Sequence, residues 1–212
     1  MIDKINLSPR LQMCADFVPF GSRFVDIGTD HGYLPIYLIK TNKISSALAC
    51  DINKEPLESA KRNAEKYQIN LVTKLSDGFK NIDENEFDCA NIAGMGGELI
   101  AKIIENCDYI KTKTLILQAM TKAMKLREYL YQNGFYIEEE KAVFDKGKIY
   151  SVMLVKFGNK EKPCLYMGKI KAGSEFSKEY ASSVLNDLRN ILKGKNDTVI
   201  AKKIEEIEEK FL

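Results

Sequence analysis

The sequence predicts an α/β fold, with one mostly parallel sheet that carries helices on both faces. Short apolar runs alternate with stretches of helical periodicity between residues 23 and 134, which is the pattern of strand-helix-strand units. The last two apolar runs, 135–144 and 149–158, are separated only by residues 145–148. With no helix between them, they should form an antiparallel hairpin at an edge of the sheet.

The predicted elements follow one another along the chain. Before the closing pair, strands are expected at 23–28, 45–53, 71–75, 87–94 and 114–120. Helices are expected at 35–42, 54–67, 98–107 and 122–134. The helix at 54–67 is supported by Leu57, Ala60, Ala64 and Tyr67, which recur at helical spacing, and by Pro56 near its start, where proline is tolerated.

The chain changes character after Gly158. Residues 159–172 are charged and contain Gly and Pro, which indicates a linker. Two helical stretches follow, at 175–194 and 196–212, and the second has an apolar stripe formed by Ile200, Ile204, Ile207 and Phe211. We therefore expect an α/β domain over 1–158, a linker over 159–172 and a helical hairpin over 173–212, with its turn between Gly194 and Asp197.

Composition limits the class of protein. A chain of 212 residues, 45% of them hydrophobic, can bury a substantial core. The five cysteines are scattered and form no CxxC pair, which argues against disulfides and structural zinc and for a reducing compartment. No apolar run has the length of a signal peptide or a membrane span. We expect a cytoplasmic protein with no membrane and no metal.

Charge is unevenly distributed along the chain. The formal net charge is only +2, yet residues Lys141–Lys171 hold eight lysines and two acidic residues. Such a segment is a candidate contact for a phosphate backbone. A solvated lysine face would have the same composition.

The loop after the first strand reads DIGTDHGYLP, residues 26 to 35. It lies where ligands bind in α/β sheets, at the carboxyl end of a strand and before a helix. The dinucleotide pattern GxGxxG is not matched, because Asp30 replaces the middle glycine and would repel a pyrophosphate. Asp30 together with Asp26 favours a ligand that is cationic at this point, and S-adenosylmethionine carries both a sulfonium and an ammonium group.

The next three strand ends add polar residues and glycines. Asp51 ends the second strand, where a carboxylate can accept both ribose hydroxyls of either NAD or S-adenosylmethionine. Asp77 and Gly78 follow the third strand in SDGF, and NIAGMGGEL ends the fourth at residues 91 to 99. Its glycines indicate close approach of the backbone to another group. A methyl group carried by a ligand across the strand ends would point at this fourth loop.

These blocks carry a resemblance to a known family. The succession LSPRL, DIGTDHGYLP, DINKEPL, SDGF, IAGMGGELI, LILQ and LREYLYQNGF resembles, in order and spacing, the bacterial tRNA (adenine-22, N1)-methyltransferase family, the TrmK family. It runs from about Leu7 to Gly158. The resemblance implies a Rossmann-like class I methyltransferase fold that uses S-adenosyl-L-methionine, followed by a coiled-coil-like helical domain that contributes to tRNA binding. Ala119 is a departure, since family members commonly have a proline after the Leu-Gln pair.

The resemblance also implies roles for individual residues. The cofactor would be lined by residues at the strand ends, namely Asp26, Gly28, Thr29, Asp30, His31, Gly32, Asp51, Ile52, Asn53, Asp77, Gly78 and Ala93. The methyl transfer is assigned to Asp30, Tyr33, Gly94, Met95 and Gly96.

The chemistry of adenine N1 gives these residues their tasks. N1 has an in-plane lone pair, so the enzyme needs mainly to position an exposed base and accommodate a cationic product. Asp30 or a carbonyl of the GMGG block would stabilise that charge, and Tyr33 or Met95 would stack the base. The chain lacks the Asn/Asp-Pro-Pro-aromatic block common among enzymes that methylate exocyclic adenine nitrogens, which favours a ring nitrogen.

Other interpretations stay open. The alternative roles are capping or packing of the following helix for His31, core packing for Tyr33 and Met95, and formation of the turn alone for Asp77. The alternative role for the C-terminal helices is dimerisation, and we expect a monomer or a weak dimer. For the whole chain, the alternatives are a methyltransferase that acts on a small molecule and a non-catalytic RNA-binding protein on the same fold.

Overall fold

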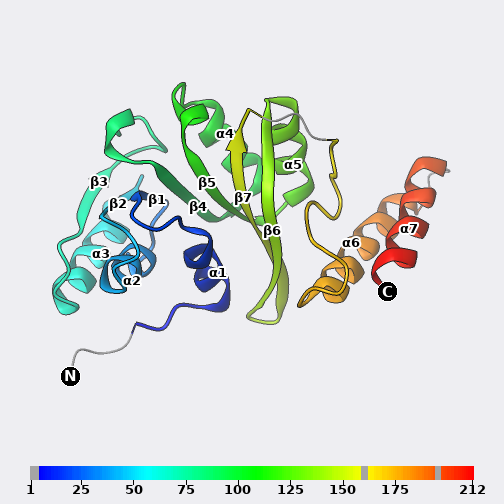
Figure 1. Ribbon diagram of the computed structural model, residues 1–212, viewed down its shortest axis with the longest axis horizontal. Coiled ribbons are helices and arrows are strands. Elements are labelled where there is room, and N and C mark those ends of the chain that lie inside the picture. Colours follow the sequence, from blue (N-terminus) through cyan, green and yellow to red (C-terminus); the bar gives the residue numbers. More distant parts are fainter. Residues whose placement is uncertain (1–4, 159–161, 194–196) are drawn as a thin grey trace.

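The computed structural model describes residues 5–158, 162–193 and 197–212, which form a seven-stranded sheet flanked by helices, with a pair of helices beyond its last strand (Figure 1). The strands are β1 (Arg23–Ile27), β2 (Ser46–Asp51), β3 (Val72–Leu75), β4 (Cys89–Gly96), β5 (Thr114–Thr121), β6 (Phe135–Asp145) and β7 (Lys148–Phe157). The helices are α1 (Pro9–Phe17), α2 (Tyr33–Lys40), α3 (Lys54–Lys66), α4 (Gly97–Glu105), α5 (Ala123–Gln132), α6 (Ser177–Leu192) and α7 (Thr198–Phe211). Two short 3₁₀ turns, η1 (Glu84–Glu86) and η2 (Ile110–Thr112), precede β4 and β5.

The strand order is β3-β2-β1-β4-β5-β7-β6. The first five strands in this order are parallel, and the β6-β7 hairpin joins β5 in antiparallel fashion through β7. The predicted mostly parallel sheet with an antiparallel hairpin at its edge is therefore confirmed. β7 lies between β5 and β6, so β6, the first strand of the hairpin along the chain, forms the outer edge of the sheet.

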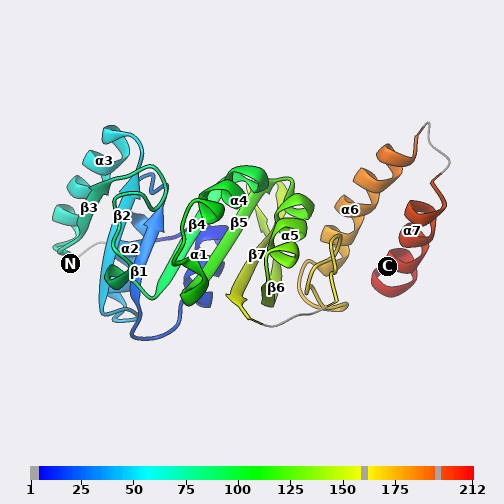
Figure 2. The same cartoon turned by 90° about the horizontal axis from the view of Figure 1, so that it is seen from above.

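Helices cover the sheet on both sides. One apolar cluster joins Val25 and Ile27 of β1 to α4 and α5, whereas Phe24 belongs to the cluster formed with α1 and α2. This alternation is the period of two that a strand buried on both faces requires. Figure 2 shows α4 and α5 on one side of β4, β5 and β7 and α1 on the other.

The tip of the β6-β7 hairpin lies at the same edge of the sheet as the carboxyl ends of the parallel strands. β7 is antiparallel to β5 and β6 is antiparallel to β7, so β6 runs in the direction of β5 and ends at this edge. The connection is a two-residue turn, with φ of 49° at Lys146 and 78° at Gly147. Two positive φ values match the tight turn that suits the twist of a hairpin.

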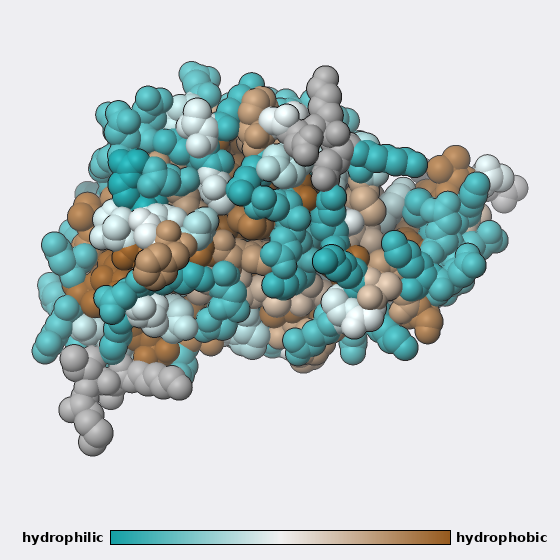
Figure 3. Space-filling model, viewed as in Figure 1, coloured by the Kyte–Doolittle hydropathy of each residue, from teal (hydrophilic) through white to brown (hydrophobic). Residues whose placement is uncertain are grey.

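The C-terminal helices form a small core of their own beside β6. Leu185 and Leu188 of α6 pack with Ile204, Ile207 and Phe211 of α7. These positions include most of the apolar stripe predicted from the sequence. On the face seen in Figure 3 the two helices carry mainly hydrophilic side chains on their outer surfaces.

Two sequence-based expectations need comment. α1 was not predicted, although Ser8 caps it, accepting a hydrogen bond from the Leu11 N–H at 3.4 Å, and Pro9 is its first residue. The predicted turn at Gly194 lies outside the described residues, but Asp197 does cap α7 by accepting from the N–H groups of Val199 and Ile200.

Candidate active site

A cavity of about 350 Å³ lies at the carboxyl edge of the sheet. It is enclosed by the start of α1, the loop after β1 and the end of β4. Its walls are Arg10, Leu11, Asp26, Gly28, Thr29, Asp30, His31, Gly32, Tyr33, Leu34, Asn91, Ala93 and Gly94. The structure thus brings most of the residues predicted in the first loop together with the start of the fourth-strand loop.

The first loop is held from outside by β2 and α3. The N–H groups of Gly28 and Thr29 donate to the Cys50 carbonyl at 2.8 and 2.9 Å, and Asn63 Nδ2 donates to the His31 carbonyl at 2.9 Å. A Cβ at Gly32 would lie 2.9 Å from the Ala60 Cβ, so glycine allows the loop to approach α3. Two of the loop's N–H groups therefore bond to β2, and the polar side chains of Thr29, Asp30 and His31 lie in the cavity wall.

Asp26 and Asn91 form a buried pair in the cavity wall. Asn91 Nδ2 donates to Asp26 Oδ1 at 2.8 Å. Asn91 is 1% exposed and Asp26 is 7% exposed. Burial raises the pKa of the Asp26 carboxyl, and the hydrogen bond from Asn91 opposes that shift. Within the described residues Asn91 Oδ1 has no hydrogen-bond partner. A buried acceptor next to a buried carboxylate suits a ligand group that is cationic and donates hydrogen bonds.

Asp30, His31 and Tyr33 lie at the mouth of the cavity. The Asp30 side chain is 83% exposed, and its carboxylate lies 3.4 Å from His31 Nε2. The rings of His31 and Tyr33 are 5.5 Å apart and tilted. Asp30 therefore lies on the solvent side of the cavity, whereas Asp26 lies inside.

The fourth-strand loop contributes in two ways. Ala93 and Gly94 line the cavity, while Met95 packs over Gly28, where its methyl group would overlap any added Cβ. Glycine is required at position 97 for packing, because a Cβ there would collide with the Lys122 carbonyl at the start of α5. Met95 and Gly96 do not line the cavity wall, so their predicted part in catalysis is not placed by this geometry.

The residues predicted at the ends of β2 and β3 lie further along the same edge. Asp51 Oδ1 accepts from the Asn53 N–H at 2.7 Å, and Ile52 is 61% exposed. Asp77 forms an ion pair with Lys80 at 2.5 Å within the turn that contains Gly78. None of these residues lines the 350 Å³ cavity, so a ligand that contacted both groups would have to extend across the strand ends.

Sequence reasoning missed Arg10 and Gln118. Arg10 Nη1 donates to Gln118 Oε1 at 2.7 Å, and Gln118 is completely buried within β5. Ala119, which stands where family members commonly have a proline, continues β5 in register with Met95. The signal for Arg10 was the LSPRL block, where a capping serine and proline begin a helix next to a basic residue.

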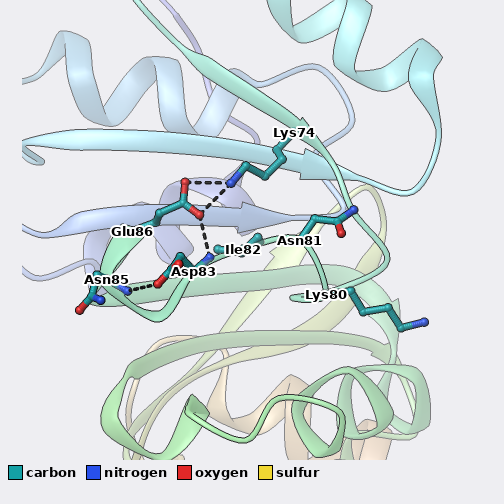
Figure 4. Close-up of a pocket in the computed structure, with 7 residues that line it drawn as sticks. All are labelled: Lys74, Lys80, Asn81, Ile82, Asp83, Asn85 and Glu86. Atoms are coloured by element: carbon teal, nitrogen blue, oxygen red, sulfur yellow. Dashed lines mark hydrogen bonds and ion pairs between the residues drawn. The ribbon is translucent and has the colours of Figure 1, made fainter.

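A larger cavity of about 650 Å³ lies between Lys74 of β3 and residues 80–86, and it shares no lining residue with the 350 Å³ cavity (Figure 4). Its charged groups are mostly paired with one another: Lys74 Nζ donates to both oxygens of Glu86 at 2.8 and 2.9 Å, and Glu86 accepts from the Asp83 N–H. Its main charged side chains, Lys74 and Glu86, therefore neutralise each other, which makes this cavity a weaker candidate for a catalytic site. Across residues 5–158, 162–193 and 197–212 there is no group of three or more His, Cys, Asp or Glu side chains arranged to hold a metal ion, and no helix long and apolar enough to cross a membrane.

Comparison with known proteins gives the site its context. Residues 7–153 match the family model described as a methyltransferase domain. The tRNA (adenine(22)-N(1))-methyltransferase of Bacillus subtilis is 38% identical over 164 residues, which cover 76% of this chain and 69% of that protein. The crystal structure of the B. subtilis m1A22 tRNA methyltransferase TrmK superposes with a TM-score of 0.77 at 31% identity, over 97% of this chain and 96% of that one. The structure of M. capricolum TrmK in complex with S-adenosyl-homocysteine superposes with a TM-score of 0.78 at 27% identity, over 96% of both chains.

The sheet order and the cavity at its carboxyl edge are those of a Rossmann-like fold, and the matched family model makes this fold a methyltransferase domain. Since the match covers more than two thirds of both the chain and its B. subtilis relative, the chain belongs to the tRNA (adenine(22)-N(1))-methyltransferase family. The predicted family and fold class are confirmed.

Proposed function

We propose that the protein transfers the methyl group of S-adenosyl-L-methionine to N1 of adenine 22, in the D-arm of tRNA. The observation that carries this proposal is the shared cavity in which the Asp26–Asn91 pair and Asp30 face Ala93 and Gly94. The M. capricolum relative binds the demethylated cofactor product on the same fold. The family supports the choice of base and position.

The chain's residues fit the cofactor's chemistry. The unpartnered Asn91 Oδ1 and the Asp26 carboxylate would hold its ammonium group, and Asp51 at the end of β2 would accept its ribose hydroxyls. Asp77 and Gly78 lie beyond Asp51 and would line the adenine. Bound there, the cofactor supplies a methyl group already activated by a sulfonium.

The remaining task of the chain is to position the target base. Adenine N1 needs no general base, because its lone pair is free at neutral pH. Tyr33, 39% exposed at the mouth, would stack the base after it leaves the tRNA helix. The Asp30 carboxylate would stabilise the positive charge that develops on the ring. Gly94, which lines the cavity wall, would limit the approach of the base through its backbone.

The surface for tRNA would extend from this edge to the C-terminal helices. Lys146 and Lys148 lie at the hairpin tip, beside the strand ends. A cavity of about 380 Å³ lies between the start of α5 and α6, and the two lysines in its wall, Lys122 and Lys125, are paired with Glu98 and Glu128. Lys141 and Lys156 of the basic segment are paired with Glu139 and Glu138, so the tip lysines would contribute more.

This assignment gives the predicted domains separate tasks. Residues 1–158 would bind the cofactor and the base, and 173–212 would hold the tRNA body, linked by 159–172. The protein would work in the cytoplasm as a monomer or a weak dimer.

The test is transfer of a labelled methyl group from S-adenosylmethionine to unmodified tRNA, with a tRNA carrying guanine at position 22 as the matched control. Label should enter the first tRNA and not the second. Equal label in both would contradict the assigned position. No label in either, with cofactor binding intact, would favour a small-molecule substrate or a non-catalytic role.

A further inference from the structure

Arg10 of α1 is bonded to Gln118 within β5 and to Asp145 at the tip of the β6-β7 hairpin. Its Nη1 donates to Gln118 Oε1 at 2.7 Å, and its Nε lies 3.5 Å from Asp145 Oδ2. Both partners are buried, with Gln118 at 0% and Asp145 at 6% exposure. An arginine held by two buried groups from different strands has a defined position.

Gln118 passes this constraint to the fourth-strand loop. The same Oε1 accepts from the Gly94 N–H at 3.1 Å, while Nε2 donates to the Ala119 carbonyl at 2.8 Å. The amide is therefore oriented from both ends: two donors meet its oxygen, and its nitrogen also lies 3.9 Å from the Met120 sulfur, a second acceptor. Arg10 gives the shorter of the two bonds to the oxygen.

Gly94 needs this support because the regular ladder fails there. The register between β4 and β5 shifts between Ala93 and Met95, and Gly94 has φ of 81°, a conformation that glycine favours. In place of a ladder partner, its N–H has Gln118. The bulge brings Gly94 into the cavity wall, next to Ala93.

We propose that Arg10 is a positioning residue for methyl transfer, acting through Gln118 to fix Gly94 of the bulge. This inference rests on the proposed function, because it takes the Gly94 wall as the place where the base and the methyl group meet. Direct contact of Arg10 with the base is disfavoured, since a guanidinium would oppose the positive charge that forms on the methylated adenine. Displacement of reacting groups by about 1 Å can cost about 100-fold in rate.

The test compares Arg10→Gln with Arg23→Gln, a matched control that removes an arginine from the Arg23–Asp88 ion pair at the start of β1. Hydrogen exchange of the Gly94 amide is measured without cofactor, followed by cofactor affinity and by kcat and KM for tRNA. Arg10→Gln should speed Gly94 exchange about 10-fold and lower kcat about 10- to 100-fold, with cofactor affinity within about threefold of wild type. Arg23→Gln should change none of these.

Gln118→Met provides a second route to the same bulge. It removes the acceptor at similar volume, so it should also expose the Gly94 amide to exchange, and combining it with Arg10→Gln should lower kcat little further. Arg10→Lys, which keeps one donor, should restore part of the lost kcat.

Three outcomes would overturn the inference. They are unchanged Gly94 exchange in both variants, additive losses of kcat in the double variant, and weakened cofactor binding with kcat retained, which would make Arg10 a cofactor contact. A wild-type protein that methylates no tRNA would instead contradict the proposed function, while the Gly94 exchange result would still test the structural link.

Discussion

Arg127 and Glu140 form an ion pair that is buried on both sides, with Arg127 Nη2 2.5 Å from Glu140 Oε1 and side-chain exposures of 1% and 0%. Arg127 belongs to α5 and Glu140 to β6, and the same guanidinium donates to the Leu165 and Tyr166 carbonyls and to the Tyr180 hydroxyl of α6. Glu140 also accepts from the Lys169 N–H. The pair therefore joins the sheet, the segment after it and the C-terminal helices at one point.

Arg127→Met should destabilise the protein and loosen α6. Removing one partner leaves a buried carboxylate without its cation, which typically costs about 3 to 5 kcal/mol. Urea unfolding measures the loss, and hydrogen exchange in α6 measures the loosening. Lys125→Met is the matched control, because Lys125 forms an exposed ion pair with Glu128, and it should change the free energy of unfolding by less than about 1 kcal/mol. A loss below about 1 kcal/mol for Arg127→Met would contradict the anchoring role.

Thiol reactivity should separate one cysteine from the rest. Cys164 is exposed, whereas Cys14, Cys50, Cys89 and Cys107 are buried. Burial raises the pKa of the Cys14 and Cys50 thiols to about 12, which leaves almost no reactive thiolate at neutral pH. A thiol reagent such as DTNB should label one cysteine quickly in the native protein and five after denaturation. Cys164→Ser should abolish the fast phase. Rapid labelling of one of the four remaining cysteines in that variant would contradict their burial.

The Asp26 carboxyl should make stability depend on pH. Its folded pKa is raised by burial, so above the unfolded value of about 3.9 the unfolded chain loses this proton first and the free energy of unfolding falls as pH rises. Asp26→Asn removes this contribution. The stability of wild type relative to the variant should therefore decrease from about pH 4 upward and level off above the folded pKa. A relative stability that stays constant or increases over this range would contradict the assigned shift.

The tip lysines should govern the salt dependence of tRNA binding. Lys146→Glu with Lys148→Glu replaces two positive charges beside the strand ends with two negative ones, and each lost phosphate contact should reduce the salt slope by about 1. Affinity is measured by titrating tRNA at several salt concentrations. Lys61→Glu with Arg62→Glu on α3 makes the same change of charge elsewhere and should have a smaller effect. Equal slopes for the two double variants would remove the hairpin tip from the RNA surface.

The sequence predicted the fold well because its patterns are local. The alternation of apolar runs with helical spacing located the strands and most helices, and the short connection at 145–148 predicted the hairpin. The position of β7 between β5 and β6 depends on which hairpin strand packs better against β5, and no local pattern contains that choice. α1 is short, and its apolar and polar residues do not separate clearly onto two faces. Only the capping serine and the proline at its start indicate it in the sequence.

The candidate site was predicted in part. Asp26, Asp30 and Gly94 share a cavity, as their place at strand ends suggested, because parallel strands end at a common edge. The link from Arg10 to Gln118 joins residues 108 positions apart and could not be found from spacing. The partner of Asn91 was equally hidden, since it depends on adjacent strands being in register at Asp26 and Asn91.

The central claim is methylation of N1 of adenine 22, and primer extension on treated tRNA tests it most directly. A methyl group on N1 blocks the Watson–Crick edge, so reverse transcription should stop at position 22 only after incubation with the protein and S-adenosylmethionine. Alkaline treatment, which moves the methyl group from N1 to the exocyclic nitrogen, should relieve the stop. Label that enters the tRNA without a stop at position 22, or a stop at another position, would contradict the account.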